Sequence, residues 1–189
     1  LGNVYQITGQ FDDALLSYRT SAEIRECDTL SRERLASSYQ NLSSVYLTLE
    51  KYEEADHYLQ MAEEIYKEYQ DTLGLAAVYN KLSVKYSDKG EYAKAEEALM
   101  KSLSLRLEAL GENNLKVAEE YANCALLMQD LNRLDEASEY VGKAISIRSK
   151  ILGDDHPDVA DVYQIQASIL MEKEDYSSAL QYYEKALDI

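Results

Sequence analysis

Apolar and small residues recur along the chain at a nearly constant period. Five alanines mark it, at intervals of 40 to 42 residues: Ala14, Ala55, Ala95, Ala137 and Ala179. A large apolar residue stands three positions before each alanine, another stands four positions after it, and a small residue stands seven after it. Positions separated by three, four and seven residues share one stripe of an α-helix. The pattern therefore predicts one amphipathic helix around each alanine.

A second stripe with the same spacing precedes the alanine stripe in four of the periods. Its first copy consists of Tyr39, Leu42, Ser43 and Tyr46, and later copies begin at Tyr79, Tyr121 and Tyr163. Each period should therefore hold two helices that pack through these stripes. We expect first helices near 31–48, 72–88, 114–130 and 157–172. We expect second helices near 11–28, 51–70, 91–110, 134–152 and 175–189.

These paired stripes resemble the tetratricopeptide repeat over essentially the whole chain. The departures are tyrosine where the family usually has tryptophan and Gln166 where it has leucine. The period is longer than the common one of about 34 residues, so each helix should be longer by about a turn. The sequence pattern LG-x-x-HP-x-VA in residues 152–160 resembles the turn that joins successive repeats, the inter-repeat corner, in kinesin light chain and nephrocystin-type arrays.

The resemblance implies an all-α, right-handed superhelical solenoid of antiparallel helix pairs. We expect a single array of about five repeats, the first one incomplete, at residues 1–30, 31–71, 72–112, 113–155 and 156–189. The sequence begins and ends within the repeating pattern, so we expect it to be a fragment of a longer solenoid.

The stretch ILGDDHPDVA, residues 151–160, could hold a metal ion or simply join two helices. Its relative in the preceding period, ALGENNLKVA, keeps the glycine but lacks the histidine and the acidic pair. A metal site needs three or four convergent ligands. The only other histidine, His57, lies on a different predicted helix. We therefore interpret the stretch as a corner, and we expect neither a metal site nor a cofactor.

The corner itself has the residues that helix ends require. Gly153 and Gly111 can adopt the left-handed conformation that ends a helix. Pro157 suits the first turn of the next helix, where a missing N–H costs nothing. Asp155 or Asp158 can face the exposed N–H groups at that helix start.

The net charge of the chain indicates which classes of partner it can bind. The chain carries 35 acidic against 19 basic residues, a formal charge of −16. This balance disfavours contacts to a nucleic-acid backbone or to an anionic membrane surface. It is compatible with a solvated surface alone or with neutral or basic protein partners. Oligomeric state does not follow from it.

The cysteines and the sequence motifs indicate the cellular location of the protein and whether it is an enzyme. Cys27 and Cys124 form no CxxC pair and no signal peptide is visible, so we expect a cytoplasmic location. The chain has no GxGxxG, GxxxxGK[ST] or GxSxG motif. Cys124 shares its repeat position with Leu1, Leu42 and Leu82, so a buried hydrophobe is a better interpretation than a nucleophile. We expect no enzyme activity.

The family resemblance also suggests where a ligand would bind. In tetratricopeptide arrays the first helices line a concave groove, on the side opposite the inward stripe. The predicted groove residues are Gln40, Asn41, Ser44, Asn80, Lys81, Val84, Asn123, Leu126, Gln164 and Ser168. The carboxamides among them could pair with the N–H and C=O groups of an extended peptide, or could be plain polar surface. Lys81 is the only cation of this set, so the basic clamps of chaperone-binding and kinesin-type members are not carried over.

The sequence predicts a protein–protein interaction scaffold, or adaptor, that binds a neutral or basic peptide in this groove. Acidic residues near it favour that charge, namely Asp88, Asp130, Asp161 and Glu172. Two alternatives remain open: a peptide-sensing regulatory module of a bacterial signalling protein, and a non-catalytic helical arm of a larger enzyme.

Overall fold

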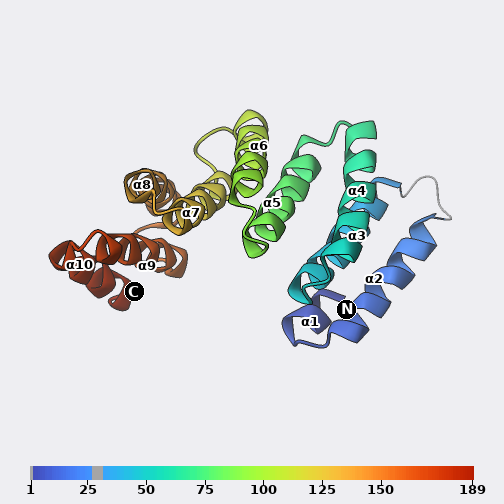
Figure 1. Cartoon of the computed structure of the whole chain (residues 1–189), viewed down its shortest axis with the longest axis horizontal. Helices are drawn as coiled ribbons and strands as arrows, with labels where there is room; N and C mark the ends of the chain where they lie inside the picture. Colours follow the sequence, from blue (N-terminus) through green and yellow to red (C-terminus); the bar gives the residue numbers. More distant parts are fainter. Residues whose placement is uncertain (1, 27–31) are drawn as a thin grey trace. The chain divides into compact units, whose positions relative to one another are not determined.

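The computed structural model describes residues 2–26 and 32–189, and in these ranges every regular element is an α-helix (Figure 1). The helices are α1 (Gly2–Ile7), α2 (Phe11–Glu26), α3 (Arg32–Thr48), α4 (Tyr52–Glu68), α5 (Thr72–Asp88), α6 (Tyr92–Leu110), α7 (Leu115–Asp130), α8 (Leu134–Leu152), α9 (Pro157–Glu172) and α10 (Tyr176–Leu187). The chain forms two compact units, residues 1–85 and 86–189, and each is described by itself.

The helix bounds agree closely with those expected from the two stripes. The first helices α3, α5, α7 and α9 begin within one residue of the expected positions and end at them. The second helices also match, and α10 ends at Leu187 rather than at the last residue. The expected end of α2 and the boundary between the first two repeats fall at residues 27–31, outside the described residues.

The turn within each helix pair is built around one residue with positive φ. These residues are Gly9, Glu50, Gly90, Asn132 and Glu174, with φ between 56° and 75°. In each turn the next N–H donates to a carbonyl five residues earlier, as Lys51 does to Tyr46 O at 2.9 Å. This bond satisfies a carbonyl that the end of the helix would otherwise leave unpaired.

The predicted stripes form the core of each unit. All five alanines of the repeating column have no exposed surface. Tyr39, Leu42 and Tyr46 of α3 are buried, as are Tyr121 and Cys124 of α7. In α5 the corresponding Tyr79, Leu82 and Tyr86 are only partly buried. Gln166 takes the buried position that leucine usually holds, with 8% of its surface exposed.

The corner at residues 153–158 joins α8 to α9 and differs in detail from the expectation. Gly153 has a positive φ of 88°, but its ψ of 157° is extended rather than left-handed helical. The cap of α9 is His156, whose Nδ1 accepts a hydrogen bond from the Asp158 N–H at 3.1 Å. Pro157 is the first helical residue and Asp158 lies in the first turn, where its charge complements the helix dipole. The imidazole thus has a structural partner that the sequence did not indicate.

Candidate peptide-binding surface

In the first unit, Gln40 of α3 is held between neighbouring helices. Its Nε2 donates to the carbonyl of Gly74 at 3.4 Å, and its Oε1 accepts from the Tyr66 hydroxyl at 3.1 Å. The Tyr66 ring lies directly over Gly74, where an added Cβ would come within 2.3 Å of the ring. Only glycine permits this approach. Both ends of the Gln40 carboxamide are therefore used to join α3, α4 and α5.

Ser44 and Lys81 bring the predicted faces of α3 and α5 together. The Lys81 ammonium donates to Ser44 Oγ, and Ser44 Oγ donates to the Gln40 carbonyl at 3.0 Å. Burial lowers the pKa of Lys81 because the charged amine loses hydration. Three of the predicted site residues thus form one connected polar cluster along two successive first helices.

The remaining predicted residues of the first unit have different surroundings. Asn41 borders an open cleft of about 610 Å³ formed by α1, α2 and α3, which also includes Asn3 and Tyr18. Asn80 is partly buried, and Val84 exposes 47% of its surface. Val84 is thus an apolar contact available beside Lys81 on α5.

In the second unit, α7 and α9 are joined in the same way. Gln129 Nε2 donates to Ser168 Oγ at 2.7 Å and also to the Glu172 carboxylate. Gln129 was not among the predicted residues, although it lies on α7 one residue before the predicted acidic Asp130. Ser168 therefore lies at the contact between the two first helices, as Ser44 does in the first unit.

The other predicted residues of the second unit are more accessible. Asn123 is partly buried, Gln164 is exposed, and Leu126 exposes 44% of its surface. Exposed carboxylates accompany them: Asp130, Asp161 and Glu172. This surface combines carboxamides, an apolar side chain and negative charge. Of the five carboxamides in the predicted row, Gln40 is tied to its own fold, whereas Asn123 and Gln164 leave their polar groups more open to a ligand.

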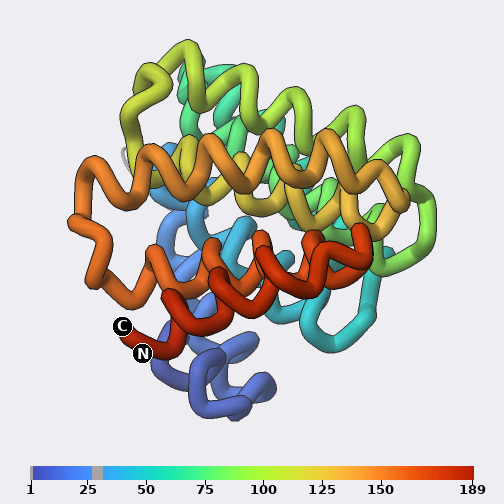
Figure 2. Tube along the Cα trace, turned by 90° about the vertical axis from the view of Figure 1, so that its left-hand side faces the viewer, coloured from blue at the N-terminus to red at the C-terminus, as the bar shows by residue number. Residues whose placement is uncertain are grey.

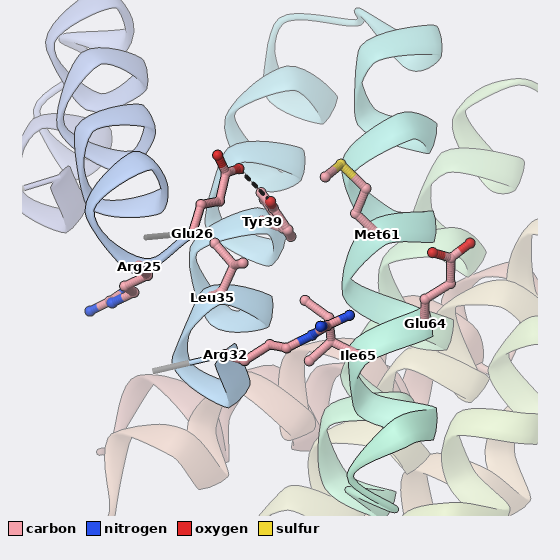
Figure 3. Close-up of a pocket in the computed structure, with 8 residues that line it drawn as sticks. All are labelled: Arg25, Glu26, Arg32, Leu35, Tyr39, Met61, Glu64 and Ile65. Carbon is pink, nitrogen blue, oxygen red and sulfur yellow. Dashed lines mark hydrogen bonds between the residues drawn. The ribbon is translucent and has the colours of Figure 1, made fainter. Parts of the chain in front are cut away.

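Another cavity of the first unit lies between α2, α3 and α4 (Figure 3). It encloses about 230 Å³ and is lined by Arg25, Glu26, Arg32, Leu35, Tyr39, Met61, Glu64 and Ile65. The Tyr39 hydroxyl donates to Glu26 at 2.6 Å, and Arg32 pairs with Glu68 at 3.2 Å. Because these polar groups already have partners, the cavity offers fewer free contacts than the faces of the first helices.

Three further features that could indicate another function are a reactive thiol, a metal site and a membrane-spanning helix. Cys124 is fully buried, and burial raises the pKa of its thiol to about 12, which keeps it protonated near neutral pH. Among residues 2–26 and 32–189, no three His, Cys, Asp or Glu side chains cluster as metal ligands would. Within the same ranges no helix has the length and apolar character needed to cross a membrane.

Solved structures with the same fold cover the whole chain. BtubC from P. vanneervenii has 20% sequence identity and a TM-score of 0.85, over 100% of this chain and 76% of its own. A putative kinesin light chain from Podosopora anserina, described by its nearly identical repeats, has 19% identity and a TM-score of 0.77, with 100% and 90% covered. The Rap conjugation gene regulator of plasmid pLS20, solved with the Phr* peptide, has 15% identity and a TM-score of 0.80, with 99% and 50% covered.

Sequence comparison gives the family. No curated protein matches the chain. The sequence model of the tetratricopeptide repeat matches residues 1–68, 74–150 and 121–189, which together span nearly the entire sequence. The helix pairs of this chain, the regular spacing of its buried alanines and its structural neighbours agree with that match. The chain belongs to the tetratricopeptide repeat family.

Proposed function

We propose that this chain is a protein–protein interaction scaffold whose first helices bind an extended peptide segment of a partner. The observation that carries the proposal is the pairing of successive first helices within each unit. Ser44 and Lys81 join α3 to α5, and Gln129 and Ser168 join α7 to α9. Each pair presents a polar strip beside an exposed apolar residue, which is the combination that an extended peptide requires.

The second unit offers the clearer peptide contacts. Asn123 and Gln164 each provide a donor and an acceptor for peptide groups, and Leu126 can contact an apolar side chain. Asp130, Asp161 and Glu172 give this surface a negative field without a basic residue among the predicted site residues of α7 and α9. We therefore propose a neutral or basic peptide as the ligand, with binding and no catalysis as the activity.

The peptide complex of the Rap regulator supports peptide binding as an activity of this fold. At 15% identity, the likeness extends to the fold and not to the ligand. We propose the scaffold as the function, because it requires only the peptide contacts described above. We place its activity in the cytoplasm, in keeping with the free, buried thiol of Cys124.

A binding titration with paired variants tests this proposal. Peptides are selected from a random library on the wild-type chain, and their affinity is then measured for an Asn123→Ala/Gln164→Ala variant. Each lost hydrogen bond that leaves a buried partner unpaired should cost about 1–3 kcal/mol. The control is Glu139→Gln/Glu184→Gln, at exposed positions on the second helices α8 and α10. Unchanged affinity in the carboxamide variant would rule out these contacts.

The charge of the selected peptides separately tests the proposal that the ligand is neutral or basic. An Asp130→Asn/Asp161→Asn variant should bind a basic peptide more slowly, and added salt should reduce the difference from wild type. Exposed charges act mainly on the association rate and are screened beyond about 8 Å at physiological ionic strength. Selection of predominantly acidic peptides would contradict the proposed ligand class.

A further inference from the structure

Two helix pairs of the second unit each hold a lysine over a pair of tyrosines. In Figure 2, α9 and α10 run side by side, and each contributes one tyrosine to a pair. Lys185 of α10 lies over this pair and Lys143 of α8 over the other, with each ammonium 5.0 to 5.7 Å from both ring centres. The negative face of an aromatic ring attracts a cation at this distance. The two pairs are Tyr121 with Tyr140 and Tyr163 with Tyr182.

The helix pair α3 and α4 has the two tyrosines without the lysine. Tyr39 and Tyr58 hold the same repeat positions, and their ring centres are 5.8 Å apart, against 6.1 and 5.7 Å in the second unit. Six residues after the column alanine, where the other pairs have Lys143 and Lys185, stands Met61. Among the residues that the structure describes, none places a cation over the ring of Tyr39.

The cavity between α2, α3 and α4 borders both Tyr39 and Met61 (Figure 3). Its wall also includes the buried side chains of Leu35 and Ile65. The volume of about 230 Å³ is below the roughly 300–1,000 Å³ of pockets for small molecules. A single side chain fits it better than a larger ligand does. The aliphatic stem of such a side chain can lie along the apolar wall while its charged end stays at the rim.

Both arginines at the rim of this cavity are already engaged by other residues. Arg25 donates to the carbonyl oxygen of Arg34 at 3.3 Å and to the hydroxyl of Ser38. Arg32 pairs with Glu68 at 3.2 Å. An anionic ligand would have to take an arginine away from one of these partners.

The two carboxylates at the rim differ from each other. Glu26 accepts a hydrogen bond from the Tyr39 hydroxyl at 2.6 Å, and burial raises the pKa of that hydroxyl, so the ring stays neutral. Glu64 is exposed and has no hydrogen bond or ion pair with any described residue. Lys67, one turn further along α4, pairs with Glu63 instead at 2.8 Å. The rim therefore has a negative charge left to pair with a cation.

We propose that this cavity binds the lysine side chain of a partner protein. The ammonium lies over the ring of Tyr39 and beside Glu64, and the aliphatic stem lies against Leu35 and Ile65. Met61 leaves this helix pair without the ammonium that the pairs of the second unit supply themselves, so the partner supplies it. The proposal does not depend on peptide binding by the first helices.

NMR of the full chain with labelled methionine methyl groups tests the site. The probe is Nα-acetyl-lysine methylamide, which should shift the Met61 methyl signal in a saturable way. The other methionines, Met100, Met128 and Met171, are internal controls and should not respond. Nα-acetyl-norleucine methylamide has the stem without the charge, and Nα-acetyl-glutamate methylamide carries the opposite charge. Neither should give a saturable shift over the same concentrations.

Variants of the chain test the two groups that define the site, with binding followed by saturation transfer to the lysine probe. Glu64→Gln should weaken binding about two- to fivefold, as the loss of an exposed ion pair does. Glu53→Gln, at another exposed carboxylate of α4, is the matched control and should leave binding unchanged. Met61→Lys gives the helix pair its own ammonium, as Lys143 does in α8, and should abolish binding.

Circular dichroism verifies that all three variants keep the fold. The proposal is overturned by an absent shift at Met61, by equal shifts from the lysine and norleucine probes, or by a larger shift from the glutamate probe. Unchanged binding in either Glu64→Gln or Met61→Lys also overturns it.

Discussion

At the residue scale, the turns inside the helix pairs differ in how easily their residues adopt positive φ. Glycine adopts it freely and asparagine tolerates it, but a β-carbon makes it costly for other residues. Gly9 and Gly90 meet this requirement, whereas Glu50 and Glu174 hold φ values of 56° and 62°. The glutamates therefore store backbone strain in two turns that glycine would relieve.

Replacing either glutamate with glycine should stabilise the chain. We expect Glu50→Gly and Glu174→Gly each to raise the free energy of unfolding by about 0.5–1 kcal/mol, as the strain removed exceeds the added entropy of the unfolded chain. Chemical denaturation measures the change. Asn132→Gly is the matched control and should have a smaller effect, because asparagine already tolerates this conformation. A loss of stability in both glutamate variants would contradict the strain assigned to these turns.

The thiol of Cys124 gives a second residue-scale prediction. Burial raises its pKa from 9.0 to about 12, so the reactive thiolate is scarce in the folded chain at pH 8. In a Cys27→Ser variant, iodoacetamide should modify Cys124 very slowly under native conditions and readily in denaturant. Because folding favours the protonated thiol, the contribution of Cys124 to the free energy of unfolding is fully present below pH 9. It is lost as the pH rises toward 12, where the buried thiol ionises. Rapid native alkylation would show that the first-helix stripe of α7 is open.

At the element scale, the interfaces between successive repeats are of two kinds, polar and apolar. The polar interface of α6 and α7 buries Glu120 completely, where its Oε1 accepts from Ser102 and pairs with Arg106 Nε at 2.8 Å. The apolar kind has alanine and valine in place of Ser102 and Glu120. A buried ion pair adds little net stability, but removal of one partner leaves a buried charge.

Single and double substitutions at this interface should therefore behave very differently. Arg106→Ala leaves Glu120 short of its cation and should cost about 3–5 kcal/mol of unfolding free energy. Ser102→Ala/Glu120→Val converts the interface to the apolar kind of Ala144 and Val162, where an arginine, Arg148, also stands at the repeat position of Arg106. Because that interface holds an arginine without a buried carboxylate opposite it, the double variant should be near neutral. Urea denaturation of both variants provides the comparison. A double variant as unstable as Arg106→Ala would mean that the two kinds of interface are not interchangeable.

Most helices were predictable from the sequence because their buried stripes repeat. An apolar residue that recurs at the same position of every repeat indicates a buried packing position, whereas a single apolar residue does not. Side-chain hydrogen bonds that occur in only one repeat leave no such repeating pattern, and the sequence did not predict them. The tie between Gln40 and Gly74 depends on a glycine at one place in one repeat, and Gln129 contacts Ser168 only through the geometry of α7 against α9. The sequence also does not predict His156 as the helix cap, because Asp155 and Asp158 are more usual residues at a helix start.

At the scale of the whole molecule, charge and repetition together limit what the chain can bind. We propose that its net charge of −16 favours basic or neutral partners and that the carboxamides of its first helices pair with a peptide backbone. Charge alone does not choose between the first and second helices, because both carry exposed acids such as Asp161 and Glu184. The distinguishing feature is that successive first helices join through polar side chains in each unit.

The most direct test is to find which helices touch a bound peptide. A photo-reactive phenylalanine analogue is placed, one position at a time, at Leu126 and Gln164 on the first helices and at Glu139 and Gln181 on the second helices, all exposed positions. A library-selected peptide is then added and irradiated, and cross-linked product is quantified by mass spectrometry. We predict cross-links from Leu126 and Gln164 and none above background from Glu139 or Gln181. Cross-links from the second helices alone, or equally from all four positions, would contradict the claim that the first helices bind the partner.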